Sequence, residues 1–343
     1  MSRILVVQTA WLGDVVLTIP LLRELRRAHP GGSITALMTP LGAETLSGSP
    51  LIDEVVVLDK RGGDGRFVGT WRCASRLRRA RFDLAVAAQR SFRTGCLVWA
   101  SRARERVGFA GAPGGWAYTR KVPWVAGDHA VRRYLSLSGP AGGDPERADP
   151  RPVLPVSPGA RQRVVEVLAG EGVGAGEAVL ALAPGSIWGT KRWTAEGFAG
   201  VARAARASGF RPILVGSALE RDLCASVATL AACGAVVLAG RTSIPEMAAL
   251  LSRSRALVTN DSGPGHVASA VGTPVVSVFG PTVPAFGYAP FGDRNRIVEH
   301  GSLECRPCHR HGPDSCPLGH HRCMGEIGAE SVWAAVEGIL AER

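Results

Sequence analysis

The feature that most constrains the fold is an alternation of strand-like and helix-like segments that occurs twice along the chain. In the first half, apolar runs typical of strands lie at 3–8, 33–38, 54–58, 82–88 and 106–109, with helical patterns at 15–28, 66–79 and 92–103. In the second half the strand-like runs lie at 178–183, 212–216, 235–238, 256–259 and 274–279, with helical patterns at 194–208, 219–232, 244–254 and 263–271. Such alternation predicts an α/β fold with a mostly parallel, doubly wound sheet in each half.

The two halves are separated by a segment, 139–159, that holds six prolines and shows no periodicity. We therefore predict two domains, residues 1–155 and 156–328. Open α/β sheets bind ligands at the carboxyl ends of their strands, which places the expected binding cleft between the two halves. Residues 329–343 have an amphipathic helical pattern, and we expect this helix to pack back toward the first domain.

Charge and hydropathy narrow the class of protein only partly. The net charge of +11 favours anionic partners, but the basic residues are almost all scattered arginines, and only Lys60, Lys121 and Lys191 are lysines. Arginines cluster at 72–81, which indicates either a solvated helix face or a surface for anionic lipid headgroups. No apolar run reaches the ~20 residues of a membrane span, so we expect a soluble, intracellular protein.

Residues 260–266, Asn-Asp-Ser-Gly-Pro-Gly-His, join an apolar strand-like run to a short helical segment. Small residues at such a junction let a ligand approach the backbone, and the first N–H groups of the helix suit a phosphate. Asp261 adds a carboxylate for sugar or ribose hydroxyls, and His266 lies one turn into the helix. Alone, this motif predicts an anionic ligand at a helix N-terminus.

A single carboxylate, Asp14, follows the first strand-like run. No G-x-G-x-x-G occurs there, which argues against a dinucleotide site at the usual first turn. Asp14 could be a helix N-cap, a general base that accepts the proton of a substrate hydroxyl, or both.

Polar residues also follow the strand-like runs of the second half. Ser186 and Lys191 come after the run at 178–183, where a hydroxyl and a cation could hold a diphosphate and offset the charge of a departing nucleoside diphosphate. Glu220 follows the next run, where a carboxylate could accept hydrogen bonds from ribose hydroxyls. A surface lysine and an ordinary first-turn helix charge are the alternatives for Lys191 and Glu220.

Four of the eight cysteines lie close together, in the order Cys305-x2-Cys308-x7-Cys316-x6-Cys323. In an intracellular chain this spacing indicates a structural metal site, with zinc or iron, before it indicates disulfides. Reduced thiols without metal and disulfides remain open.

Three short motifs occur in order along the chain: Leu12-Gly13-Asp14, Pro184-Gly185-Ser186 with Lys191-Arg192-Trp193, and Asp261-Ser262-Gly263-x-x-His266. In these motifs the chain resembles the ADP-heptose:lipopolysaccharide heptosyltransferases of glycosyltransferase family nine, and Trp11 before Leu-Gly-Asp is most similar to the heptosyltransferase II branch. The resemblance implies a GT-B fold, in which two Rossmann-like domains face a central cleft. It also implies an inverting transfer of heptose from ADP-heptose to a sugar hydroxyl of the lipopolysaccharide inner core.

The resemblance further implies a role for each motif residue and a set of partners. No cofactor for catalysis, no nucleic acid, a cytoplasmic location and a peripheral contact with the inner leaflet of the inner membrane are expected. The first domain would bind the acceptor and the second the nucleotide sugar. The implied roles are a catalytic base at Asp14, diphosphate contacts at Ser186 and Lys191, a ribose contact at Glu220, a position near the adenine at Thr242, a heptose contact at Asp261, and the phosphate-side loop at Ser262, Gly263 and His266.

Three other functions are weighed against this one. The same motifs would occur in a family-nine transferase that uses a different acceptor, either a protein or another glycan. They would also occur in one that uses a different donor nucleotide. An NAD-dependent oxidoreductase is disfavoured by the missing glycine fingerprint. A zinc-module nucleic-acid binder is disfavoured because no basic–aromatic stripe is evident in the sequence.

Overall fold

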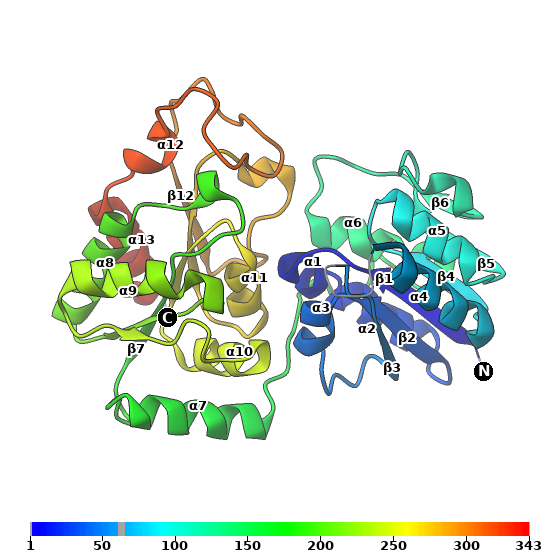
Figure 1. The fold of residues 1–343 in the computed structure, drawn as a ribbon, viewed down its shortest axis with the longest axis horizontal. Coiled ribbons are helices and arrows are strands. Elements are labelled where there is room, and N and C mark those ends of the chain that lie inside the picture. Colours follow the sequence, from blue (N-terminus) through cyan, green and yellow to red (C-terminus); the bar gives the residue numbers. More distant parts are fainter. Residues whose placement is uncertain (1, 61–65, 343) are drawn as a thin grey trace. The chain divides into compact units, whose positions relative to one another are not determined.

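The structure is a computed structural model that describes residues 2–60 and 66–342 (Figure 1). The chain divides into two compact units, Met1–Val153 and Leu154–Arg343, called here the N-terminal and C-terminal units. Within the described residues each unit holds a six-stranded sheet in which every pair of neighbouring strands is parallel. The predicted α/β fold with two doubly wound sheets is confirmed.

The N-terminal unit has the strand order β3-β2-β1-β4-β5-β6. The chain therefore changes its direction of winding between β1 and β4, and this switch point is where open α/β sheets bind ligands. Its elements are β1 (Arg3–Gln8), α1 (Leu12–Leu17), α2 (Ile19–Ala28), β2 (Ser33–Met38), α3 (Pro40–Thr45), β3 (Glu54–Val57), α4 (Arg66–Ala80), β4 (Leu84–Ala87), α5 (Phe92–Ala100), β5 (Glu105–Phe109), the 3-10 helix η1 (Gly115–Ala117), β6 (Arg120–Val122), α6 (Ala130–Ser136) and η2 (Gly139–Ala141).

The C-terminal unit has the strand order β12-β11-β10-β7-β8-β9, with the switch point between β7 and β10. Its elements are α7 (Pro158–Gly170), β7 (Val179–Ala183), η3 (Gly189–Lys191), α8 (Ala195–Ala207), β8 (Arg211–Leu214), η4 (Ala218–Glu220), α9 (Arg221–Ala231), β9 (Val236–Val237), α10 (Ile244–Arg253), β10 (Leu257–Asn260), α11 (Gly263–Ala270), β11 (Val275–Phe279), η5 (Pro284–Phe286), β12 (Asn295–Glu299), α12 (Arg322–Gly325) and α13 (Ala329–Ala341).

The cores of both units follow from the sequence of their central strands. All five residues of β7 and of β11 are buried, as are all four of β4, which matches their near-continuous apolar sequence. In the N-terminal unit α4 packs against α5 and α2 packs against α6; in the C-terminal unit α8 packs against α9 and α7 against α10. A parallel sheet needs such covering because both of its faces are apolar.

The prediction of a single helix at 15–28 was wrong, because the structure has two helices there that meet at Thr18. Pro20 lies in the first turn of α2, where its missing N–H costs nothing. In the middle of a longer helix the same proline would remove a hydrogen bond and clash with the preceding turn. The segment 139–159 is also more ordered than predicted at its end, since α7 begins at Pro158 with Ser157 as its N-cap.

The amphipathic pattern of the C-terminal helix is present in α13, whose buried residues are Val332, Val336 and Ile339. We expected this helix to pack back toward the first domain. In the structure its buried side chains belong to the core of the C-terminal unit, and α13 packs against α8, β11 and β12. The packing toward the first domain stays a prediction.

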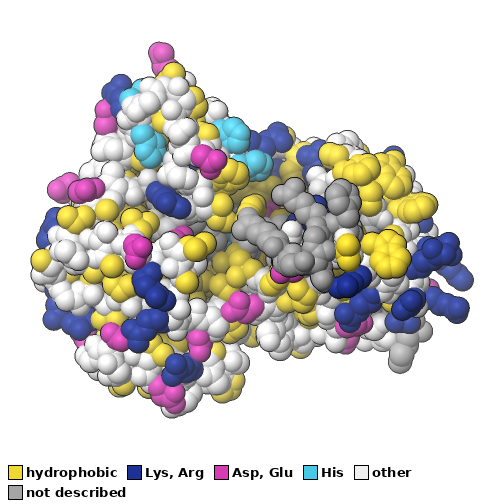
Figure 2. Space-filling model, in the orientation of Figure 1, with side chains coloured by type: hydrophobic (Ala, Val, Ile, Leu, Met, Phe, Trp, Pro, Cys, Tyr) yellow, Lys and Arg dark blue, Asp and Glu magenta, His cyan; other side chains and the backbone are white. Residues whose placement is uncertain are grey.

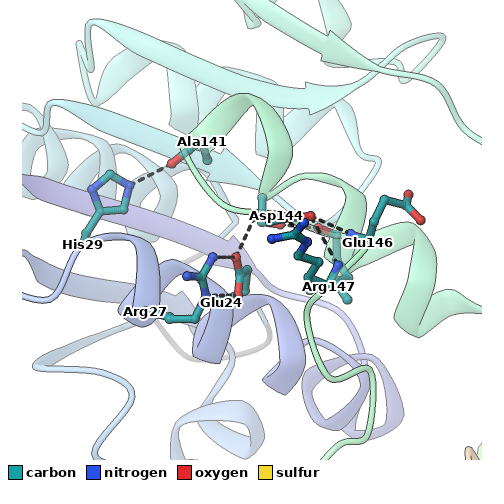
Figure 3. Close-up of polar contacts among 9 residues, drawn as sticks. Glu24, Arg27, His29, Ala141, Asp144, Glu146 and Arg147 are labelled. Carbon is teal, nitrogen blue, oxygen red and sulfur yellow. Dashed lines mark hydrogen bonds and ion pairs between the residues drawn. The ribbon is translucent and has the colours of Figure 1, made fainter.

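A buried carboxylate, Glu24 of α2, holds the segment that follows η2 (Figure 3). Its side chain is 3% exposed. It accepts hydrogen bonds from the backbone N–H of Asp144 at 2.6 Å and from Nε and Nη2 of Arg27 at 2.8 and 2.6 Å. Beside it, His29 Nε2 lies 2.7 Å from the carbonyl oxygen of Ala141. These contacts fix the end of the N-terminal unit to α2.

We expect Glu24→Gln to lower the free energy of unfolding by about 1–3 kcal/mol at neutral pH, since charge-assisted hydrogen bonds are lost at a buried position. Hydrogen bonding from Arg27 holds the pKa of Glu24 below its ordinary value. A lowered folded-state pKa stabilises the protein above the unfolded pKa, and this stabilisation is lost as the pH falls through the folded-state pKa. Denaturant unfolding should therefore show a difference between the two proteins at pH 7 that shrinks in acid.

The matched control is Glu146→Gln, at an exposed position on the same segment. Its unfolding free energy should stay within about 0.5 kcal/mol of the parent protein. A Glu24→Gln protein that is as stable as this control at pH 7 would contradict the assignment.

Candidate functional site

A largely buried ion pair lies at the carboxyl edge of the sheet in the C-terminal unit. Asp261 directly follows β10 and Lys191 ends η3, which follows β7, so the two residues flank the switch point. Lys191 Nζ is 2.6 Å from Asp261 Oδ2, and the two side chains are 13% and 9% exposed. Thr282 Oγ1 donates to the same carboxylate oxygen at 2.7 Å. Two residues predicted separately from the sequence are thus partners, and the lysine charge is compensated.

Asn260 connects the two loops that carry this pair. Its buried amide donates from Nδ2 to the carbonyl oxygens of Pro184 and Gly185, at 2.8 and 3.2 Å. Its Oδ1 accepts from the backbone N–H of Trp193 at 2.9 Å. Trp193 is 2% exposed and donates from Nε1 to the carbonyl oxygen of Ile327 at 3.0 Å. The asparagine therefore fixes the loop after β7 to the end of β10.

The helix after Asp261 begins at the same sheet edge. Ser262 is the N-cap of α11, with an extended backbone, and its Oγ lies 3.1 Å from Thr259 Oγ1. The positive end of the helix dipole favours an anion there, but of the first-turn residues Pro264 has no N–H and the N–H of Gly265 donates to the carbonyl oxygen of Ser262 at 3.2 Å. Gly263 begins this helix, and His266 is largely buried one turn further on, at 7% exposure.

Gly265, inside the first turn of α11, shows how closely this loop is packed. A Cβ at this position would lie 3.2 Å from Thr259 Cγ2 and 3.3 Å from Pro290 Cγ. The glycine therefore lets the start of the helix lie close against the end of β10.

Ser186 and Glu220 lie beside one another in sheet order, because they follow the neighbouring strands β7 and β8. Ser186 is 5% exposed and its carbonyl oxygen accepts from Arg192 Nε at 2.8 Å. Glu220 Oε2 accepts from the backbone N–H of Ser217 at 2.7 Å, so the carboxylate caps a helix start. Its Oε1 lies against the backbone, since a Cβ on Gly185 would come within 1.9 Å of it.

Thr242 lies farther along the same edge, in the turn between the edge strand β9 and α10. It is partly buried. Strand order therefore places Glu220 between the loop of Ser186 and Thr242.

Asp14 lies at the corresponding edge of the N-terminal unit, after β1. The N-cap of α1 is Trp11, so the N-cap alternative for Asp14 was wrong; Asp14 occupies the third helical position. Its Oδ2 accepts from the backbone N–H of Trp11 at 3.3 Å, and its Oδ1 accepts from Tyr134 Oη at 2.6 Å. Tyr134 was not predicted, because it lies 120 residues away and no local pattern connects it to Asp14.

Two cations lie near the same strand end. Lys60 Nζ donates to the carbonyl oxygen of Thr9, which follows β1. Burial, and then the nearby charge of Arg93, lower the pKa of Lys60. The sequence singled out Lys60 only because lysines are rare in this chain.

The four clustered cysteines are all free thiols. Their charges influence one another: burial, and then the neighbouring thiolates, raise the pKa of Cys323 to about 11. Backbone N–H groups of residues 318–321, that of His321 above all, lower the pKa of Cys316. Among residues 2–60 and 66–342, no three His, Cys, Asp or Glu side chains form a group that could hold a metal ion. The metal site therefore stays a prediction.

The cysteine segment, defined here as residues 305–323, contacts the turn that carries Lys191. His321 Nε2 lies 2.8 Å from the carbonyl oxygen of Thr190, and Thr190 Oγ1 donates to the carbonyl oxygen of Pro313. From the same segment, Arg306 Nη2 donates to the carbonyl oxygen of Thr282 at 3.2 Å. The segment thus supports both the lysine and one hydrogen-bond partner of Asp261.

Comparison with known proteins places these features in a family. Residues 70–316 match the model of glycosyltransferase family 9 (heptosyltransferase). The chain is 31% identical to lipopolysaccharide heptosyltransferase 1 of Pseudomonas aeruginosa, over 89% of this chain and 86% of the relative.

Two solved structures have a similar fold. The glycosyltransferase of family 9 from Veillonella parvula DSM 2008 has a TM-score of 0.86 and 26% identity, covering 100% of this chain and 98% of that one. The ADP-heptose lps heptosyltransferase II of E. coli has a TM-score of 0.80 and 22% identity, with 99% of each chain covered. With the two doubly wound sheets, these matches confirm the predicted GT-B fold.

Proposed function

Since this chain belongs to glycosyltransferase family 9, the heptosyltransferase family, and is a glycosyltransferase, we propose that it transfers heptose from ADP-heptose to a sugar hydroxyl of the lipopolysaccharide inner core. The observation that carries this proposal is the Lys191–Asp261 pair beside the N-terminus of α11. A cation and the positive end of a helix dipole at a switch point suit a nucleoside diphosphate. The oxidoreductase and nucleic-acid alternatives have no comparable support.

The donor would lie along the carboxyl edge of the C-terminal sheet. Its diphosphate would contact Lys191 and the first turn of α11, at Ser262 and Gly263, with Ser186 on the neighbouring loop. The sheet order then supports a ribose near Glu220 and an adenine near Thr242, because β8 and β9 follow β7 in that direction. Asp261 would accept a hydrogen bond from a heptose hydroxyl, and His266 would complete the phosphate-side loop.

The reaction would be a single displacement with inversion at the anomeric carbon. The acceptor oxygen forms the new bond, Asp14 takes its proton, and the bond to the donor diphosphate breaks with its electron pair going to ADP. Lys191 and the positive end of the α11 dipole stabilise the negative charge on the departing ADP. Tyr134 is a positioning residue, because its hydroxyl holds one oxygen of Asp14.

The acceptor would be recognised by the N-terminal unit. Lys60 and Arg93, near the end of β1, suit an acceptor that carries carboxylate or phosphate groups. The lipopolysaccharide core proposed as acceptor is attached to a lipid, so we propose a peripheral contact with the inner leaflet of the inner membrane. No helix in the described parts of the chain is long and apolar enough to cross a membrane.

Calorimetry with ADP, GDP, UDP and NAD tests the donor assignment, followed by an assay for ADP release from ADP-heptose. We expect preferential binding of ADP, and ADP release that depends on the lipopolysaccharide acceptor. Preference for GDP or UDP would keep the reaction class and change the donor. Release that depends on a protein or another glycan would change the acceptor. Tight NAD binding without any nucleoside diphosphate preference would contradict the proposal.

We further propose that the cysteine segment holds a structural zinc or iron ion through Cys305, Cys308, Cys316 and Cys323. Four thiolates are a donor set that suits either metal, and the spacing Cys305-x2-Cys308-x7-Cys316-x6-Cys323 places all four within one short segment. The ion would stabilise a segment that is poor in regular structure. It would act on the donor site only by supporting the Lys191 turn.

Elemental analysis of untagged protein is expected to give close to one zinc or iron ion per chain. The double variant Cys305→Ser/Cys308→Ser should lose this metal and melt at a lower temperature, because metal binding contributes folding free energy. The matched control is Cys96→Ser/Cys233→Ser, at two partly buried cysteines outside the segment, which should keep the metal. Metal-free parent protein with an unchanged melting temperature in the first variant would rule the proposal out.

A further inference from the structure

Large aromatic side chains are exposed together on the N-terminal unit. Phe92 and Trp99 of α5 are 60% and 61% exposed, and Trp116 of η1 is 54% exposed. The ring centroid of Trp116 lies 6.1 Å from that of Phe92 and 6.2 Å from that of Trp99, so the three form one cluster. Trp71 of α4 is 71% exposed and lines an open depression together with Trp99. Hydrophobic side chains exposed singly are normal on a protein surface, but a contiguous exposed cluster indicates a binding surface.

Unpaired arginines lie directly beside these aromatics. A second open depression, of about 840 Å³, shares Arg78 and Arg102 with the first. Its arginines are Arg78, Arg79, Arg81, Arg102 and Arg104. Among the described residues none of these five forms a salt bridge. Asp83 is the acidic residue in this lining, and its Oδ2 accepts the backbone N–H of Arg3 at 2.8 Å. Figure 2 shows hydrophobic and basic side chains side by side on this part of the molecule.

Two of these arginines occupy positions where glycine is the usual residue. Arg81 follows α4 and Arg102 follows the end of α5, with φ of 53° and 57°. A side chain in this left-handed conformation carries a steric cost that glycine avoids. The helix dipole favours cations at these helix ends, which accounts for part of the arrangement. It gives no reason for the exposed tryptophans beside them.

We propose that the face formed by α4, α5 and η1, called here the aromatic–arginine face, docks on an anionic lipid bilayer. Tryptophan rings lie at the level of the lipid headgroups, and phenylalanine rings insert at their boundary with the acyl chains. Arginines bind the lipid phosphates. Trp71 and Trp99 line one open depression together with Arg78 and Arg102, and Phe92 and Trp116 are exposed beside it. Exposed aromatic rings next to unpaired arginines on helix surfaces suit the interface of an anionic membrane. A single-stranded nucleic acid, whose bases would stack on the same rings, is the alternative that the test below must separate from it.

This inference deepens one part of the proposed function, the contact with the inner membrane. Its test measures vesicle binding and needs no sugar transfer, so the docking proposal and the proposed function can fail separately. Vesicles of phosphatidylcholine alone and of equimolar phosphatidylcholine and phosphatidylglycerol are mixed with the full-length protein and sedimented. We expect binding to the anionic vesicles, weakened by salt, and little binding to the neutral ones.

Arg81→Gly/Arg102→Gly removes two charges at positions whose backbone glycine tolerates at least as well, so the variant should fold. It should weaken binding to anionic vesicles about thirtyfold, because each basic residue near an anionic surface raises the affinity about fivefold. Trp99→Ser/Trp116→Ser should weaken it about as much. The emission of the parent protein should shift to shorter wavelength on binding, and this shift should be much smaller in the tryptophan variant.

Controls remove equivalent groups elsewhere. Arg161→Gln/Arg294→Gln removes two exposed arginines of the C-terminal unit, and Leu219→Ser removes a side chain that is 98% exposed. Both should bind vesicles like the parent. Equal binding by the face variants and these controls would overturn the proposal. So would a parent protein that ignores anionic vesicles, or one that binds an RNA oligonucleotide in preference to them.

Discussion

Replacing Asp14 by Asn should reduce the turnover number about 10²- to 10⁴-fold, which is the usual contribution of a general base, while ADP binding stays nearly unchanged. Asparagine keeps the size of the side chain and one acceptor oxygen for the Tyr134 hydroxyl. It cannot take the proton of the acceptor hydroxyl. The two quantities to compare are the rate of acceptor-dependent ADP release and the dissociation constant of ADP from calorimetry.

Tyr134→Phe is the variant that separates proton transfer from positioning. It removes the hydroxyl that lies 2.6 Å from Asp14 Oδ1 but keeps the carboxylate. We expect a loss of about tenfold in turnover, the scale of one neutral hydrogen bond. If Asp14→Asn turns over like the parent protein, Asp14 is not the base. If both variants lose activity equally, the carboxylate acts through its position and not as a proton acceptor.

The fold was predictable where local patterns are long. The strands at 3–8 and 33–38 have their predicted bounds, since each is an apolar run that ends in polar or turn residues. Short elements such as β6, α6 and β12 were missed, because three to seven residues are too few to show a period. The break at Thr18 depended on Pro20, which the helical pattern of the whole segment concealed.

The candidate site was predictable only as separate residues. The motifs placed Lys191 and Asp261 at strand ends, but the ion pair joins positions 70 residues apart. Neither the pairing nor the role of Asn260 in joining the two loops follows from spacing. Tyr134 lies in a helix that the sequence did not reveal, so its contact with Asp14 could come only from the packing of α6 beside α1.

Lys191→Ala should weaken ADP binding about hundredfold, more than the loss of one exposed cation would explain. The substitution leaves Asp261, at 9% exposure, with Thr282 as the hydrogen-bond donor that remains to its Oδ2. An uncompensated carboxylate would then face the donor diphosphate. Truncating one partner of a buried charge pair costs about 2–5 kcal/mol, and about 1.4 kcal/mol corresponds to a tenfold change in affinity. Calorimetric titration with ADP gives the dissociation constant directly.

A double-mutant cycle shows whether the pair acts as a unit. Asp261→Asn alone should leave ADP binding unchanged or tighter, because it removes a negative charge, while slowing transfer through the loss of the heptose contact. Lys191→Ala/Asp261→Asn should bind ADP about tenfold more tightly than Lys191→Ala, since the repulsive carboxylate is gone; coupling of this size is usual for residues in contact. Lys121→Ala, at an exposed lysine of β6, is the matched control and should bind ADP like the parent. If the double variant binds ADP no better than Lys191→Ala, the electrostatic account of this pair is wrong, and Lys191 contributes to donor binding independently of Asp261.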